Sequence, residues 1–151
     1  MIGYSCKYAP VELIQAYGGE ARLLDAEAAD FSAAETLTHA NLCCHAKALI
    51  QQAQGEEELV LTDCCDATRR AFDVLDAQKP RRFMFQFDLP HDDNGCARAR
   101  FARELCRFAK AYGAYRKSVF SAERFLSACR DNSHLLLPDE PFIGILGARV
   151  S

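Results

Sequence analysis

The chain has 151 residues, 50% hydrophobic and 26% charged, which predicts one compact domain, or one domain with part of a second. Its 18 basic and 21 acidic side chains leave a net charge of −3, which argues against a nucleic-acid-binding protein. No apolar run approaches the roughly 18 residues of a membrane span, and the N-terminus has no signal-peptide pattern. We therefore expect a cytoplasmic protein with neither a membrane nor a nucleic acid as partner.

Apolar runs and turn residues alternate along the chain in a strand–helix rhythm. Pro10 suits the first position of a helix that stops at Gly18, and residues 59–62 (LVLT) are typical of a buried parallel strand. This alternation predicts an α/β fold, a Rossmann-like three-layer lobe with a mostly parallel sheet and helices on both faces. In chain order we expect a helix over 10–17, a strand over 20–25, a helical turn over 30–35, a helix over 42–54, a strand over 59–62, a helix over 67–75, a strand over 83–89, and helices over 97–112 and 122–132.

The last residues have a different pattern. Residues 138–141 (PDEP) are typical of a linker, and residues 142–150 (FIGILGARV) of a buried strand. We predict that residues 1–138 form the α/β lobe and that residues 139–151 are a linker and the first strand of a second lobe. On this interpretation the chain is a fragment of a longer protein or a split subunit.

Eight cysteines indicate metal binding, redox chemistry or apolar packing, because a reducing compartment disfavours structural disulfides. Ligands of an open parallel sheet bind at the carboxyl ends of its strands. Cys6 follows the apolar residues 2–4, and the pair Cys64-Cys65 follows residues 59–62. The pair Cys43-Cys44 lies at the predicted start of a helix, where the helix dipole favours a thiolate.

Two other interpretations of these cysteines stay open. Cys106 and Cys129 lie inside predicted helices, where a cysteine is most often a small buried hydrophobe. His39 and His45 flank the first pair and could complete a zinc site of mixed ligands. No C-x-x-C pair is present, so the zinc-ribbon and thioredoxin signatures are missing.

Five segments, in order, give the chain a resemblance to the 2-hydroxyacyl-CoA dehydratase family, which includes benzoyl-CoA reductase subunits and double-cubane cluster proteins. The segments around the two cysteine pairs are the specific part of the match. The five segments are residues 4–14 (YSCKYAPVELI), 39–47 (HANLCCHAK), 62–70 (TDCCDATRR), 87–91 (FDLPH) and 142–148 (FIGILGA).

The resemblance implies a 4Fe–4S cluster held by three cysteines in each subunit. By position it gives the ligand role to Cys43 and Cys65, with Cys6, Cys44 and Cys64 as secondary candidates. Cys44 and Cys64 could be alternative ligands, supports for a larger cluster, or packing residues. The third ligand of the family lies in a second lobe. Soft thiolates suit iron–sulfur clusters. The family also implies an ATP-dependent iron–sulfur activator protein, an acyl-CoA substrate, and a second lobe or similar subunit as partners.

Three functions are therefore considered for the chain. The first is the cluster-binding lobe of a lyase that dehydrates a 2-hydroxyacyl-CoA by a radical reaction, after one-electron activation by its partner. In that case we expect residues 1–151 alone to be inactive. The second is a non-catalytic interaction or assembly module for the activating ATPase. The third is a small zinc protein that uses Cys43, Cys65 and either His39 or His45.

Overall fold

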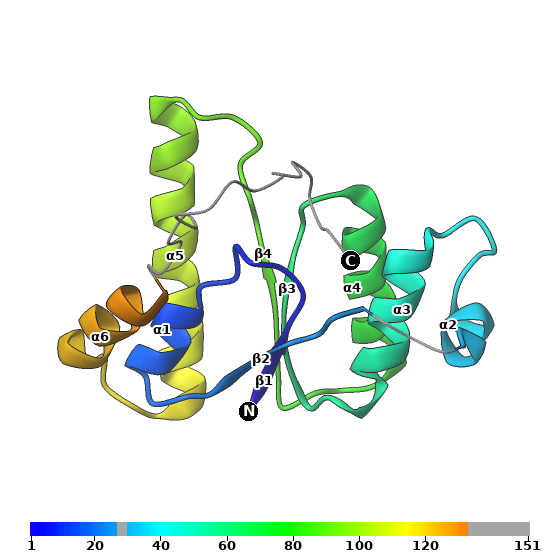
Figure 1. Cartoon of the computed structure of the whole chain (residues 1–151), viewed down its shortest axis with the longest axis horizontal. Coiled ribbons are helices and arrows are strands. Elements are labelled where there is room, and N and C mark those ends of the chain that lie inside the picture. The colour runs from blue at the N-terminus through cyan, green and yellow to red at the C-terminus, as the bar shows by residue number, and fades with distance from the viewer. Residues whose placement is uncertain (27–29, 133–151) are drawn as a thin grey trace, which may run out of the picture.

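The computed structural model describes residues 1–26 and 30–132, which form a parallel sheet with helices on both sides (Figure 1). Its bounds confirm the predicted order of strands and helices and add a first strand at residues 2–4. The elements are β1 (Ile2–Tyr4), α1 (Val11–Ala16), β2 (Ala21–Leu23), α2 (Ser32–Leu37), α3 (Cys44–Gln52), the 3₁₀ turn η1 (Ala53–Gly55), β3 (Glu58–Thr62), α4 (Asp66–Gln78), β4 (Phe83–Phe87), α5 (Gly95–Arg116) and α6 (Ala122–Asn132).

The strands lie in the order β2-β1-β3-β4, and every pairing in the described part of the chain is parallel. The register places Gly3 opposite Leu59, and Leu59 opposite Met84. Parallel neighbours require crossover connections, and the helices between the strands supply them. The predicted parallel sheet is confirmed.

Each face of the sheet has its own hydrophobic core, because successive side chains of a strand point to opposite faces. Leu59 and Leu61 of β3 join an aliphatic core with α3 and α4, whereas Val60 between them joins the core on the other face. Phe108 and Tyr112 of α5 pack into that second core. In Figure 1, α1, α5 and α6 lie on one side of the sheet, and α2, α3 and α4 on the other. These two covered faces confirm the Rossmann-like three-layer lobe.

Five of the six expected helix starts in the described residues lie one or two residues from the observed ones, and two of them concern caps. The helix expected over 42–54 begins at Cys44, with Cys43 as its N-cap residue, and passes into the 3₁₀ turn η1. Pro10, expected at the first helical position, is the N-cap of α1. Apolar periodicity does not mark where a cap residue leaves the helical conformation, so it locates a helix better than its first residue.

Cys106 is exposed, so its predicted burial is wrong, whereas Cys129 is half-buried. The buried residues of α5 include Ala97, Phe108 and Tyr112, and Cys106 faces away from this stripe. The predicted linker and strand over 139–151 lie outside the described residues.

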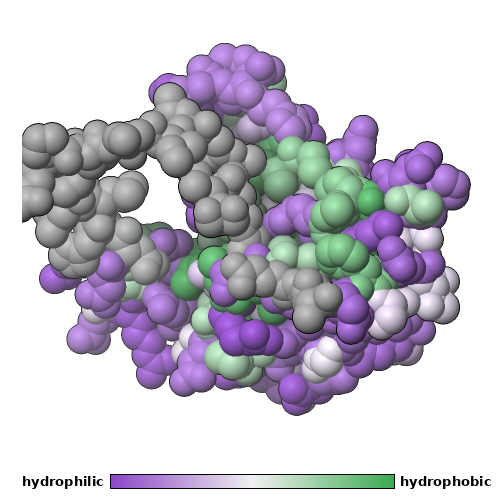
Figure 2. Space-filling model, turned by 45° about the vertical axis from the view of Figure 1, so that its right-hand side comes forward, coloured by the Kyte–Doolittle hydropathy of each residue, from purple (hydrophilic) through white to green (hydrophobic). Residues whose placement is uncertain are grey.

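Within residues 1–26 and 30–132, no helix combines the length and the apolar character that crossing a bilayer requires. Figure 2, in which α2, α3 and α4 come forward, shows mainly hydrophilic residues with a smaller hydrophobic band among them. Such a surface is expected for helices whose inner faces fill the core.

Candidate functional site

The carboxyl edge of the sheet is where the predicted site residues lie. β3 runs from this edge into α4, and β4 leads into α5, so both helices begin there. α3 ends just before β3 begins, so its N-terminus also points toward the carboxyl edge (Figure 1). α3 and α4 pack against each other, and both helices begin on the side of the carboxyl edge.

Cys43 and Cys65 occupy equivalent positions on these neighbouring helices. Cys43 is the N-cap of α3 and Cys65 the N-cap of α4, both with extended backbone. Both are exposed, as are the adjacent Cys44 and Cys64. Their exposure rules out the interpretation of the two pairs as buried packing. The helix dipole and the free N–H groups of the first turn favour a negative charge at both N-caps.

The thiol of Cys65 is held as an acceptor by the first turn of α4. The Thr68 hydroxyl lies 3.6 Å from its Sγ, while the Cys65 N–H donates to Thr68 Oγ1 at 3.2 Å. Partial burial raises the pKa of the thiol, but hydrogen bonds from the backbone N–H and hydroxyl of Thr68 and the N–H of Ala67 outweigh this effect. The pKa of Cys65 is therefore below its ordinary value, which favours a thiolate able to bind a soft metal.

Cys64 precedes this thiol in the chain, and Cys6 lies on a loop that is hydrogen-bonded to the end of β3. The hydroxyls of Thr62 and Thr68 each lie 3.7 Å from Sγ of Cys64. The Thr62 N–H donates to the Ser5 hydroxyl at 3.4 Å, which links the end of β3 to the loop that carries the half-buried Cys6. The loops after β1 and β3, which carry Cys6 and the pair Cys64-Cys65, are thus joined by a hydrogen bond.

Asp63 is a residue of the site whose role the sequence analysis missed. It is buried, and its Oδ1 accepts the Leu89 N–H at 2.9 Å while its Oδ2 accepts Arg69 Nη2 at 2.9 Å. It therefore ties the turn after β3 to the turn after β4 and fixes the loop that carries the second cysteine pair. An Asp directly after a buried apolar run is the signal that could have identified it.

A second carboxylate fixes the turn after β4 from the side of α5. The Asp88 N–H donates to Glu104 Oε1 at 2.9 Å, and Arg107 Nε donates to Glu104 Oε2 at 2.8 Å. Burial raises the pKa of Glu104, but the hydrogen bonds from Arg107 and Asp88 and the charge of Arg107 outweigh it. The pKa of Glu104 is therefore below its ordinary value.

A cavity of about 580 Å³ opens beside Cys64 at this edge. Leu89, Phe101 and Leu105 give it an apolar wall, and Arg98 and His91 add polar groups. Pockets of this size with a few polar groups typically bind small molecules. Its other lining residues are Tyr8, Pro90, Asp92, Asp93, Ala97 and Ala102.

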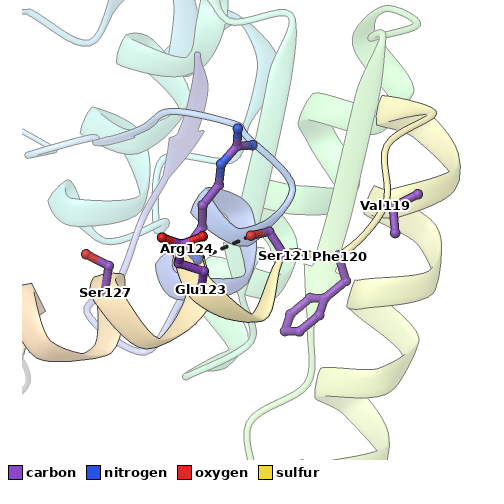
Figure 3. A pocket seen from close by; sticks show the side chains of 6 residues that line it. All are labelled: Val119, Phe120, Ser121, Glu123, Arg124 and Ser127. Carbon is purple, nitrogen blue, oxygen red and sulfur yellow. Dashed lines mark hydrogen bonds between the residues drawn. The ribbon is translucent and has the colours of Figure 1, made fainter.

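A larger cavity, of about 730 Å³, has no residue of the two cysteine pairs in its lining (Figure 3). Its walls come from the segment after α5 and from α6, and include Val119, Phe120 and Arg124. The Ser121 N–H donates to the carbonyl of Ala16 at the end of α1, just before β2 begins. This cavity is therefore at the amino edge of the sheet, where none of the predicted site residues lies.

The donor atoms suit part of a metal–sulfur site. In the described ranges, no three His, Cys, Asp or Glu side chains gather closely enough to hold a metal ion. His39 Nδ1 accepts the Asn41 N–H at 3.2 Å, and the mixed zinc set with Cys43 and Cys65 is not assembled there. The exposed thiols at the N-caps of these two packed helices are soft donors of the kind that metal–sulfur sites use.

Comparison with protein families gives a match over residues 6–133 to the model described as "2-hydroxyglutaryl-CoA dehydratase, D-component". The match includes both cysteine pairs and every element from α1 to α6. No curated protein sequence matches the chain. The chain belongs to the 2-hydroxyglutaryl-CoA dehydratase D-component family.

Proposed function

We propose that this member of the 2-hydroxyglutaryl-CoA dehydratase D-component family is the iron–sulfur-binding lobe of a 2-hydroxyacyl-CoA dehydratase-type enzyme. Cys43 and Cys65 are its thiolate ligands to a 4Fe–4S cluster, with Cys6, Cys44 and Cys64 as secondary candidates. The observation that carries the proposal is the position of two exposed thiols at the N-caps of the neighbouring helices α3 and α4.

The surroundings of Cys65 favour the thiolate form that a cluster ligand needs. Cys65 accepts hydrogen bonds from Thr68 and Ala67, and these stabilise the thiolate. Hydrogen bonds to a ligating sulfur also tune the properties of a bound cluster. Asp63 holds the loop of Cys65 against the turn after β4, so the thiol is presented from a fixed loop.

The substrate side of the proposal rests on the apolar cavity next to Cys64. Leu89, Phe101 and Leu105 would exclude water around an acyl chain that reaches toward the cysteines. When bound, a cluster of this kind would supply low-potential single electrons for the reductive loss of the 2-hydroxyl group. The residues of this lobe would bind and orient the acyl-CoA.

The partners belong to the same proposal. An ATP-dependent iron–sulfur activator would deliver the electron, and a second lobe or similar subunit would supply the third cluster ligand. With two primary ligands on one edge, residues 1–151 would leave the cluster open to solvent. The described part of the chain would then be inactive without that partner.

The test is anaerobic reconstitution of the full chain with iron and sulfide, with and without a second lobe. We expect broad absorption near about 400 nm with iron and sulfide in similar amounts. The double variant Cys43→Ala/Cys65→Ala should lose both signals. The matched control, Cys106→Ala/Cys129→Ala, removes two helical cysteines away from the carboxyl edge and should keep them.

Other outcomes would favour the alternatives. A colourless protein that contains zinc, lost in the Cys43→Ala/Cys65→Ala variant, would indicate a zinc protein. A folded, metal-free protein even with the second lobe present would rule out the cluster assignment. The interaction or assembly module for an activating ATPase would then be the better hypothesis.

A further inference from the structure

A basic groove lies on the outer flank of α5. Its volume is about 430 Å³, and Arg103, Arg107 and Lys110 line it together with Ala102 and Cys106. Glu104 is the one acidic side chain of α5, so this helix carries a strong positive charge on a chain whose net charge is negative. The groove therefore concentrates positive charge on one flank of the lobe.

Two of the three cations, Arg103 and Lys110, have no partner within residues 1–26 and 30–132. Arg107 is engaged, because its Nη2 donates to the Gln86 carbonyl at 2.5 Å and its guanidinium lies 4.0 Å from the Phe85 ring centroid. Arg103 and Lys110 are exposed, and no ion pair or hydrogen bond joins either of them to another side chain in the described part of the chain. They are separated by two helical turns, about 10 Å along the axis, and both can approach a ligand without breaking a contact.

The basic groove and the apolar cavity at the carboxyl edge meet on the same helix. Ala102 lines both of them, with Phe101 and Leu105 on the apolar side and Arg103 on the basic side. Cys64 is at the far wall of the apolar cavity. A ligand lying along α5 would thus pass from the cysteine pair, over an apolar wall, to two unpartnered cations.

We propose that the groove binds the phosphate groups of an acyl-CoA, with Arg103 and Lys110 as the recognising residues and the apolar cavity as the site of the acyl end. This assignment deepens the proposed function and rests on it. A CoA thioester has the required polarity, because its acyl end is apolar and its nucleotide end carries several phosphates. Arginine and lysine both bind phosphate through charge-assisted hydrogen bonds.

The test is isothermal titration of the full chain, without a reconstituted cluster, with adenosine 3′,5′-bisphosphate. We expect Arg103→Ala/Lys110→Ala to weaken binding at least about tenfold, since each charge-assisted hydrogen bond typically contributes that much. The matched control is Arg70→Ala/Lys79→Ala, on α4 and at its C-cap, which removes the same charge from the opposite side of the sheet and should leave binding unchanged. Arg103→Lys/Lys110→Arg should retain binding.

Two further arms distinguish the sources of phosphate. Adenosine should not bind, and inorganic phosphate should bind much more weakly than the bisphosphate. Absence of bisphosphate binding, equal losses in both alanine pairs, or equally strong binding of inorganic phosphate would each overturn the assignment. The cluster reconstitution described above is measured separately, so either proposal can fail while the other stands.

Discussion

The two ends of the sheet are built in different ways. At the carboxyl edge, loops are joined by polar contacts such as the one from Asp63 to Leu89, and the cysteine pairs are exposed. At the amino edge, aromatic rings pack closely, and Tyr112 is fully buried against neighbouring elements. The carboxyl edge exposes thiols, whereas the aromatic packing at the amino edge holds the helices against the sheet.

The amino edge tolerates polar atoms that make no hydrogen bond. Tyr115 Oη donates to Glu58 Oε1 at 2.8 Å, but Glu58 Oε2 and Tyr112 Oη have no hydrogen-bond partner in the described residues. At the carboxyl edge, by contrast, both carboxylate oxygens of Asp63 and of Glu104 are hydrogen-bonded. Nε2 of Gln86, one residue before the end of β4, also lacks a hydrogen-bond partner in the described residues, so the contrast holds for the carboxylates and not for every polar atom.

Removing Asp63 should have the largest effect on stability. Asp63→Ala leaves the Leu89 N–H without its acceptor and frees Arg69, so we expect a loss of about 3 kcal/mol in the free energy of unfolding. Urea denaturation measures it. The control Asp73→Ala breaks an exposed pair with Arg70 and should cost at most about 0.5 kcal/mol. Similar losses in both variants would contradict the role given to Asp63.

Adding a side chain at Gly19, at the amino edge, should have the next largest effect on stability. A Cβ at Gly19 would lie 2.2 Å from Tyr112 Oη and 2.9 Å from Ile14 Cγ2, so Gly19→Ala must displace buried groups. We expect a loss of about 2 kcal/mol, seen as a lower melting temperature. Gly55→Ala is the control, because nothing lies within 4 Å of the added atom. An unchanged melting temperature for Gly19→Ala would show that this end is more loosely packed.

Lowering the pH should reduce the free energy of unfolding, because the carboxylate of Glu104 at the carboxyl edge becomes protonated. Its folded-state pKa is lowered, so its contribution is fully present above the unfolded value of about 4.3 and is lost as the pH falls through the lower folded value. Glu104→Gln should therefore flatten the dependence of unfolding free energy on pH in this range. Denaturation curves at several pH values test it, and an unchanged slope would contradict it.

The smallest predicted effect concerns two tyrosines at the amino edge. Tyr112→Phe removes a buried hydroxyl that has no hydrogen-bond partner, so stability should stay the same or rise by up to about 1 kcal/mol. Tyr115→Phe removes the hydrogen bond to Glu58 and should cost about 1 kcal/mol. Chemical denaturation of the two variants side by side measures the difference, and the opposite order would refute this account of the amino edge.

Much of the fold could be predicted from the sequence. The buried run at 59–62 and the alternation around it predicted a parallel sheet, and the structure confirms this sheet. The first strand at residues 2–4 was noted only as an apolar stretch, because three residues are too few to show a periodicity. The predicted burial of Cys106 was wrong because it was inferred from the residue type and not from the position of Cys106 on the helix.

The candidate site was predictable in its residues but not in its arrangement. The sequence placed Cys43 and Cys65 at helix starts, and both are N-caps in the structure. That α3 and α4 are neighbours follows from their packing on one face of the sheet. The clamp made by Asp63 joins residues 26 positions apart, a contact that local patterns cannot reveal.

The order of elements, the parallel sheet and the family follow from local patterns, because hydrophobic periodicity and the motifs around the cysteines can be seen in the sequence alone. Which cysteines are exposed, which cavity lies beside Cys64, and which basic residues of α5 line a groove depend on the folded arrangement. These features depend on how distant segments pack, since a side chain becomes exposed or buried only when its neighbours in space are fixed.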